Sequence, residues 1–386
     1  GFAKIGDILG SINLGIFLFT CFQMFILISS LSYMLVYLRR EKVPFIYRFI
    51  VLCIFAFVPV FPFYALSPVK DTIFASLLIF YIIEIHKLLT NKTFKRLDYI
   101  GLFLLLLIMM LIRNNAIYMI LLSFPVLIIL LKKKRVPLFV LLFSSIFVYE
   151  IHNRILLPMM HITPGSIREV MSVPFQQTAR YVKYYDKEVT TKEKEAIDKI
   201  LGYETLASRY EPDLADKVKN NFNKNATGDD LKAYFKVWLE CFFKHPMVYI
   251  DALANTTYGY FYPNTSNWYI YHEYDTKLIE SGLDYHYNSL KISRGALTGI
   301  GVAYPYIPII GSLVNVGFIV WIYLYLLTFM IVENKKKLIP LLLPAFALLL
   351  TILVGPVNTY FRYIFPIMAS LPLILGLTYQ NFKKES

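Results

Sequence analysis

The chain has 386 residues, of which 57% are hydrophobic, 17% aromatic and only 17% charged, and its mean hydropathy is +0.54. Soluble domains contain about 45–50% apolar and about 25% charged residues, so the composition excludes soluble globular, disordered and disulfide-stabilised proteins. The net charge is +13, and a membrane protein collects such an excess at the cytoplasmic ends of its spanning helices. The composition therefore predicts a multi-pass membrane protein with no nucleic-acid partner.

Apolar runs alternate with short charged clusters along most of the chain. A spanning helix needs about 20 mostly apolar residues. We expect an all-α, polytopic transmembrane helical bundle with nine spans, at 12–38, 44–66, 71–89, 97–112, 115–131, 136–156, 305–332, 338–354 and 360–380. The fourth and fifth spans are short and meet at Arg113, so the two are alternatively one helical hairpin.

These spans define three predicted domains. An N-terminal transmembrane bundle of six spans covers 1–156, a large helical loop domain covers 157–304, and a C-terminal bundle of three spans covers 305–386. The first residue, Gly1, is preceded by no start methionine, and no basic signal-peptide region follows it. This beginning indicates a chain that lacks an upstream span.

The connections between the spans divide into a basic set and a nearly neutral set. Sixteen Lys and Arg residues lie in the first set, at 39–42, 87–96, 132–135, 335–337 and 383–384. The second set has three in its short turns, Lys70, Arg113 and Arg362. Because basic connections stay on the cytoplasmic side, the second set and the loop domain are predicted to be extracytoplasmic.

The loop domain is polar, and helical patterns appear in it at 190–202 and 229–244. The apolar stripe of the second helix recurs near the 3.6-residue period of a helix, through Leu231, Phe235, Trp238 and Phe242. This stripe is expected to pack on the membrane bundle or to lie in the membrane interface. Tyr and Trp residues crowd the stretch 256–274, which predicts an interfacial belt or, alternatively, a stacking surface beside an active site.

Ionisable residues at membrane depth are costly and usually face a cavity or a partner, and two outer turns are selected in this way. Lys70 and Asp71 lie together at the mouth of spans two and three. The pair either belongs to a site or starts a helix, since Asp71 is favoured by the helix dipole and Thr72 can cap that helix. Arg113, with Asn114 and Asn115, suits a phosphate or sugar hydroxyls, or forms a hairpin turn.

Further cations lie on the same predicted side. Arg362, flanked by Tyr360 and Tyr363, opens the last span and is either a clamp on an anionic headgroup or an interface anchor. Arg168 and Arg180 belong to a stretch that is expected to run along the membrane. No metal motif, P-loop, GxGxxG or GxSxG pattern occurs. With those sites excluded, we expect an outward-facing, partly hydrophobic cavity lined by one acid and several cations. Such a cavity fits a lipid-phosphate-linked substrate.

Two short motifs resemble the GT-C superfamily of polytopic glycosyltransferases. Ser67-Pro68 with Asp71-Thr72 resembles the Pro…Asp segment at the outer end of a span in the dolichyl-phosphate-mannose and lipid A aminoarabinose transferase branch. Arg362-Tyr363 with Pro366 resembles the Arg-Tyr…Pro that opens a late span there. The chain as a whole is more similar to uncharacterised bacterial membrane proteins grouped near these enzymes, which implies a bacterial plasma membrane.

The resemblance implies an inverting sugar transfer from a polyprenyl-phosphate-linked donor to a cell-envelope acceptor on the outer face. Lys70, Arg113, Asn114, Asn115, Arg168, Arg180, Tyr360, Arg362 and Tyr363 would bind substrate. Asp71 would be an acceptor-side or metal-supporting carboxylate, with the main base upstream of Gly1. Asp7 lies near the region where such enzymes carry their acid, but its neighbours do not resemble the usual acidic pair, so the alternative is a protein that is not a catalyst. No cofactor is required, and a divalent cation, Mg²⁺ or Mn²⁺, stays open.

The alternatives are an O-antigen-type glycan polymerase or ligase, and a transporter or flippase of a lipid-linked substrate. A polymerase or ligase also combines many spans with one large outer loop. Transporters place charges near the bilayer midplane and often show inverted repeats, whereas these charges lie at the outer rim and no repeat is visible. The partners expected are the lipid-linked donor and membrane lipids, and the oligomeric state is left open.

Overall fold

The computed structural model describes residues 6, 8, 10–90, 94–160, 162, 168, 170–264, 269, 270, 290–355 and 357–385. Helices make up most of these residues, and the β-structure among them is limited to two isolated bridges, Glu211 with Leu214 and Leu214 with Val357. The predicted all-α class is therefore confirmed. Asp7 and much of the aromatic stretch 256–274 lie outside the described residues.

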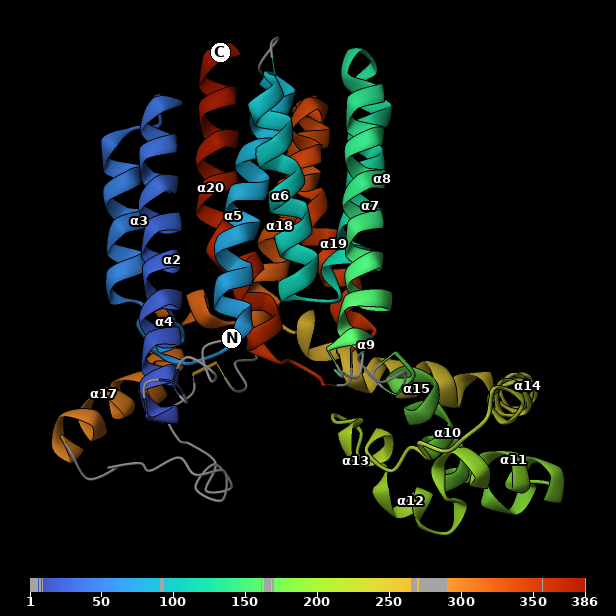
Figure 1. Cartoon of the computed structure of the whole chain (residues 1–386). Coiled ribbons are helices and arrows are strands. Elements are labelled where there is room, and N and C mark those ends of the chain that lie inside the picture. The colour runs from blue at the N-terminus through green and yellow to red at the C-terminus, as the bar shows by residue number, and fades with distance from the viewer. Residues whose placement is uncertain are drawn as a thin grey trace.

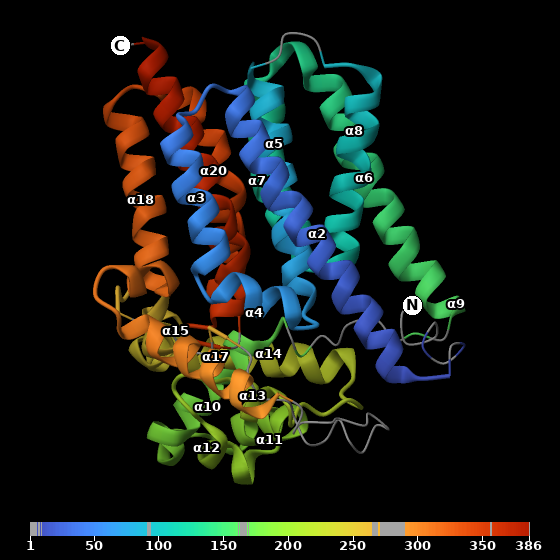
Figure 2. The ribbon, with the colours of Figure 1, turned by 90° about the vertical axis from the view of Figure 1, so that its left-hand side faces the viewer.

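Ten described helices make up a bundle, which Figures 1 and 2 show from two directions. They are α2 (Ile12–Arg40), α3 (Phe45–Phe57), α4 (Val60–Leu66), α5 (Lys70–Thr90), α6 (Arg96–Ile112), α7 (Ala116–Leu130), α8 (Arg135–Ile151), α18 (Val316–Val332), α19 (Leu343–Leu353) and α20 (Phe361–Glu385). Apart from α4, which follows α3 after a bend of 54°, consecutive helices alternate in direction (Figures 1 and 2). The basic connections therefore gather at one end of the bundle and the turns with Lys70 and Arg113 at the other.

Four of the described helical segments are long and apolar enough to cross a membrane: α2, α5, α20 and the run Lys132–Met159 that contains α8. A fifth is obtained if α3 and α4, which meet at an angle of 54°, form one span. The helices α7, α18 and α19 are apolar but shorter. The structure thus supports a membrane protein with four or five candidate spans.

Two predicted spans begin later than expected. In the span 338–354, a 3-10 segment at Lys336–Leu341 precedes α19, which starts at Leu343. The range 305–332 was predicted as a single helix, but α18 starts at Val316, and short 3-10 turns at Tyr304–Tyr306 and Ile310–Val314 precede it. Pro305 and Pro308 lie in this segment, and a proline lacks the amide donor that an α-helix needs in its interior. The apolar content of the segment was therefore misleading about its conformation.

The helices α5 and α20 form the centre of the bundle. In the most apolar stretch of α5, 72% of the residues are buried, and in that of α20, 78% are. In the most apolar stretch of α2, only 28% are buried. Tyr64 of α4 stacks on Phe365 of α20 with ring centroids 4.3 Å apart, and both side chains are fully buried. The two central helices both begin at the end of the bundle where the loop domain lies, as Figure 1 shows.

The loop domain consists of α10 (Ser172–Tyr185), α11 (Thr191–Leu201), α12 (Leu206–Arg209), α13 (Asp216–Lys219), α14 (Gly228–Lys244) and α15 (Pro246–Thr257). These helices pack around a second hydrophobic core, separate from that of the bundle, with Phe175, Tyr181, Tyr234 and Tyr249 among its buried residues. Capping boxes at Thr190 and Thr227 start α11 and α14. Both predicted loop helices are thus present nearly at their predicted bounds.

The apolar face of α14 packs within the loop domain itself. Its fully buried residues, Tyr234, Val237 and Cys241, face the second core. Leu231, Trp238 and Phe242 are partly buried against the same core. Phe235 is 38% exposed. The expectation that this stripe packs on the membrane bundle is therefore wrong, because α11, together with aromatic side chains of α10 and α15, packs against it within the loop domain.

Candidate functional site

The carboxylate of Asp71 lies in the first turn of α5, directly after the break between α4 and α5. Pro68 favours this break, because the residue before a proline is restricted to extended backbone, and Ser67 is extended at ψ 125°. Asp71 is only 1% exposed. The start of a central helix therefore places one acid inside the protein at the loop-domain end.

The backbone around Asp71 is held by a glutamine from another helix. Gln23 of α2 donates from Nε2 to the carbonyl oxygens of Tyr64, Ala65 and Ser67, at 3.0, 3.3 and 2.6 Å. These are carbonyls that the end of α4 would otherwise leave unsatisfied. Thr72 donates to the Tyr64 carbonyl as well, at 3.0 Å, so it does not cap α5 as predicted. Its hydroxyl instead ties α5 to the end of α4.

Arg113 approaches Asp71 from the turn between α6 and α7. Its Nη1 atom lies 3.1 Å from Oδ1 of Asp71, and the residue is 5% exposed. Its guanidinium carbon lies 5.4 Å from the ring centroid of Phe74 and 5.1 Å from that of Tyr363, within the range of cation–π attraction. Arg113 is thus held by one carboxylate and two aromatic rings.

Arg362 approaches the same carboxylate from the first turn of α20. Its Nε atom lies 3.2 Å from Oδ2 of Asp71, and 29% of its side chain is exposed. Its guanidinium carbon lies 4.8 Å from the ring centroid of Tyr360 and 5.5 Å from that of Tyr363. Arg362 is therefore the member of the group that solvent or a ligand reaches most easily.

We call Asp71, Arg113 and Arg362 the charged triad. The triad comprises one negative and two positive groups, so its formal charge is +1. Burying a charge without a partner is very costly, and Asp71 offsets that cost for both arginines. Both oxygens of Asp71 face guanidinium groups, which favours the supporting role over the acceptor-side role that the sequence left open. The surplus positive charge suits an anion that approaches Arg362.

The other predicted site residues fall into two groups. Lys70, Asn114 and Asn115 are exposed and adjoin triad members in the sequence, so they lie at its rim. Arg180 belongs to the loop domain, where it contacts Asp251 and the hydroxyl of Tyr210, both at 3.0 Å.

The structure therefore does not bring Arg180 to the triad. Arg168 is partly buried, but most of its neighbours along the chain lie outside the described residues. Its place relative to the triad stays a prediction.

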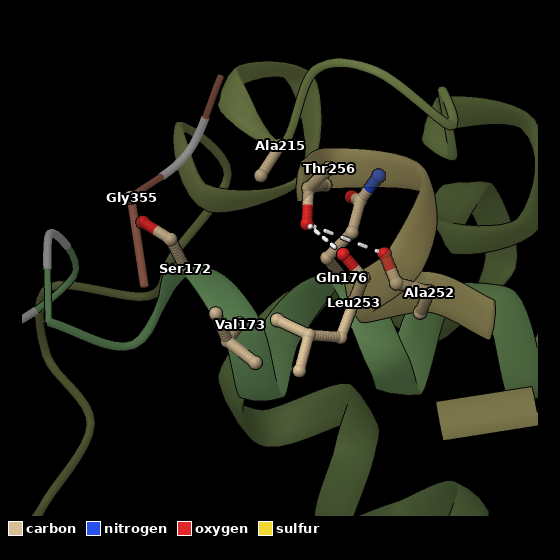
Figure 3. A pocket seen from close by; sticks show the side chains of 8 residues that line it. All are labelled: Ser172, Val173, Gln176, Ala215, Ala252, Leu253, Thr256 and Gly355. Atoms are coloured by element: carbon tan, nitrogen blue, oxygen red, sulfur yellow. Dashed lines mark hydrogen bonds between the residues drawn. The ribbon is translucent and has the colours of Figure 1, made fainter. Parts of the chain in front are cut away.

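A small pocket lies between the loop domain and the chain that leads into α20, and the triad does not line it. Figure 3 shows its walls, formed by Ser172, Val173, Gln176, Ala215, Ala252, Leu253, Thr256 and Gly355. Its walls leave essentially no room for a water molecule between them, whereas small-molecule sites usually measure about 300–1,000 Å³. The pocket is thus a seam between α10, α15 and the chain that leads into α20, and it is too small for a sugar.

Several residues around the triad escaped the sequence reasoning. Gln23 could have been found, because an amide in the middle of the apolar run 12–38 is the kind of polar residue that a membrane interior must pair. Phe74 carried no such signal, since an aromatic residue in an apolar span is ordinary. Tyr260 and Asp213 contact the segment before α20 from the loop domain, and only the fold brings them there.

Within the described ranges, no group of three or more His, Cys, Asp and Glu side chains is placed to hold a metal ion. Asp71 itself faces two guanidinium groups, which would repel a cation. The charged triad is therefore suited to an anion rather than to Mg²⁺ or Mn²⁺.

The comparisons with known proteins are consistent with one family over the whole length. The profile of the Family of unknown function (DUF6020) matches residues 1–386. No curated protein and no solved structure is significantly similar to the chain. The function must therefore be argued from the site.

Proposed function

The chain belongs to the DUF6020 family, and we propose that it is a membrane glycosyltransferase. It would transfer a sugar from a polyprenyl-phosphate-linked donor to a cell-envelope acceptor on the outer face of the membrane. The observation that carries this proposal is the charged triad, in which Asp71 holds two arginines in a buried site of net positive charge. The resemblance of the triad-bearing turns to GT-C enzymes gives the same direction.

The arginines are suited to the leaving group of this reaction. The acceptor oxygen would attack the anomeric carbon as the bond from that carbon to the phosphate oxygen breaks, and the acceptor proton would pass to a base. The departing polyprenyl phosphate gains negative charge, which fixed cations stabilise without reorganisation. Arg362 is the more exposed of the two, so it would meet the phosphate first, and Arg113 would act from within.

Asp71 would then be a positioning residue rather than the base. A carboxylate between two guanidinium groups keeps both side chains in one place and offsets their mutual repulsion. Neither of its oxygens is placed toward an acceptor hydroxyl, since they face Nη1 of Arg113 and Nε of Arg362. The base that accepts the proton is to be sought outside the triad.

The distribution of charge supports the outer side for this site. The triad lies at the end of the bundle that carries the loop domain. The predicted cytoplasmic basic clusters lie at the opposite end, after α2, α5 and α18 and before α6 and α8 (Figure 1). With nine spans, this arrangement would place the triad near the outer surface of the bacterial plasma membrane. A lipid-linked donor carries its phosphate at that depth.

The proposal is tested with the full chain in lipid nanodiscs and a labelled polyprenyl-phosphate sugar. Arg362→Ala is expected to lower sugar transfer by about 10²-fold or more, as loss of a group that stabilises developing charge does. The matched control is Arg96→Ala, an exposed arginine at the opposite end of the bundle, which should leave transfer unchanged. Equal activity of wild type and Arg362→Ala would refute the assignment.

The donor used distinguishes the proposed enzyme from its alternatives. Transfer from a polyprenyl monophosphate sugar supports the proposal, while transfer from diphosphate-linked glycans alone would identify a polymerase or ligase of the O-antigen type. Movement of the intact lipid-linked sugar across a vesicle membrane, without transfer, would identify a flippase.

A further inference from the structure

The segment 357–360 leads directly into α20 and hence to Arg362. Thr359 in this segment has a positive φ of 55°, a conformation that a β-branched residue adopts only where its surroundings impose it. Thr359 is 1% exposed. The sharp bend before α20 is therefore fixed by contacts, and most of those contacts come from the loop domain.

Asn358 makes the first set of these contacts. Its backbone N–H donates to the carbonyl of Asp213 at 2.9 Å, and its Nδ2 donates to Oδ1 of Asp213 at 3.1 Å. Its Oδ1 accepts from the backbone N–H of Gly259 and from the hydroxyl of Thr359, both at 3.0 Å. One side chain thus joins two separate parts of the loop domain to the start of α20.

Tyr260 makes the second set. Its hydroxyl donates to the carbonyl of Val357 at 2.9 Å and accepts from the backbone N–H of Tyr360 at 3.1 Å. These partners lie on either side of the bend, so one hydroxyl holds both ends of it. The side chain of Tyr260 is fully buried.

Gly259 shows how closely the two parts approach. A Cβ atom at this position would lie 1.7 Å from Oγ1 of Thr359 and 2.8 Å from Oδ1 of Asn358. Only a glycine leaves room for these contacts. We call the contacts of Asp213, Gly259 and Tyr260 with residues 357–360 the clasp.

The clasp acts on residues that hold the triad. Tyr360, whose N–H is bound by Tyr260, lies beneath the guanidinium of Arg362 at 4.8 Å. Tyr363, in the first turn of α20, contacts both arginines. A change in the path of residues 357–360 therefore moves Arg362 and its aromatic supports relative to Asp71.

We propose that the clasp makes the loop domain part of the anion site, with Tyr260 and Asp213 as positioning residues for Arg362. This inference rests on the proposed function, because the anion is taken to be the polyprenyl phosphate of the donor. Neither residue touches the triad. They act by holding the bend from which Arg362 projects.

The test uses the full chain in nanodiscs with undecaprenyl phosphate as the probe. Tyr260→Phe removes both hydrogen bonds of the hydroxyl and keeps the ring. Its affinity for the probe should fall about three- to tenfold, the factor that corresponds to the net worth of one or two hydrogen bonds. Deuterium exchange of the Tyr360 amide should rise by a similar factor. The control is Tyr258→Phe, whose ring is 52% exposed, and it should change neither quantity.

A second pair of variants is made on the surface of the loop domain, where folding is not at risk. Asp213→Ala removes the acceptor of Asn358 Nδ2, whereas Asp213→Asn keeps a carbonyl oxygen in that place. Asp213→Ala should weaken probe binding and Asp213→Asn should restore it, while the unfolding temperature is the same in both.

The possible failures are distinct. Wild-type protein that does not bind undecaprenyl phosphate would overturn the proposed function and the inference with it. Wild-type protein that binds, together with Tyr260→Phe and Asp213→Ala variants that bind equally well, would overturn the positioning role alone.

Discussion

The most direct prediction concerns Asp71→Asn, which removes the only negative charge of the triad and keeps the shape of its side chain. Removing one partner of a buried ion pair costs about 3–5 kcal/mol, because a charge is left without compensation. Arg113 is 5% exposed and is left in that state. The 29% exposed side chain of Arg362 retains some solvation, so its contribution is nearer the ~0.5–1 kcal/mol of a surface pair.

A hydrogen bond from a guanidinium group to the amide oxygen of the new asparagine would return about 1 kcal/mol. The expected loss in the free energy of unfolding is therefore about 3–5 kcal/mol, measured by denaturant titration in mixed micelles. The matched control is Asp229→Asn, since the Asp229 side chain is 91% exposed in its pair with Lys232, and it should cost less than about 0.5 kcal/mol.

Coupling between the two charges gives a second readout of the same reasoning. In the double variant Asp71→Asn/Arg113→Gln, the charge of Arg113 is removed together with that of Asp71, so no uncompensated charge is left at position 113. Its cost should be at least about 1 kcal/mol smaller than the sum of the single variants. An Asp71→Asn protein as stable as wild type, or strictly additive costs, would refute the view that Asp71 compensates buried arginines.

Three further predictions concern the clasp and the loop domain. Gly259→Ala should lower the free energy of unfolding by about 1–3 kcal/mol through overpacking against Thr359, which is measured as a lower unfolding temperature. The control is Gly228→Ala, which should leave stability unchanged because a Cβ there has no neighbour within 4 Å. Equal stability of the two variants would contradict the clasp. Burial alone would raise the pKa of Glu193, but hydrogen bonds from Lys244 and Thr190 outweigh it and hold that pKa below its ordinary value. The ionised Glu193 therefore stabilises the folded protein fully above the unfolded-state pKa of about 4.3, and this contribution is lost as the pH falls through the lower folded pKa. In acid titrations followed by Trp fluorescence, Glu193→Gln should be less stable than wild type near pH 7, and the difference should disappear below about pH 4. Stability curves of the two proteins that stay parallel over this range would contradict the prediction. Burial, followed by the charge of Glu193, raises the pKa of the Cys241 thiol to about 12, so this thiol should resist maleimide at pH 7.5 until the loop domain unfolds, and rapid labelling of folded protein at Cys241 would disprove it.

The sequence was sufficient for the parts of the fold that depend on local patterns. Charge clusters and apolar runs located the bundle helices, and helical patterns at 190–202 and 229–244, the second with an apolar stripe near the 3.6-residue period, located two loop helices. The start of α18 at Val316 was missed because hydropathy does not register the two prolines before it. The packing of α14 was missed because an amphipathic stripe does not say which apolar surface will cover it.

The candidate site was predictable for a different reason. Asp71, Arg113 and Arg362 stand out because a charge between two apolar runs is expensive, and that cost is visible in the sequence. That all three meet at one carboxylate follows from tertiary packing, which the sequence alone does not display. The clasp was beyond reach altogether, since Asp213 and Asn358 are 145 residues apart and both are ordinary turn residues.

The adjacent starts of α5 and α20 have a consequence for the charge at the triad. Each helix presents the positive end of its macrodipole at its first turn, and the triad lies where both ends meet. Asp71, in the first turn of α5, is attracted by the positive end of that helix. Arg362, in the first turn of α20, is repelled by the positive end of its own helix. Because both helices begin at the triad, exchanging the two residues would leave this balance unchanged. The two positive helix ends favour an acid at either start, and they add to the surplus positive charge that an anion would meet.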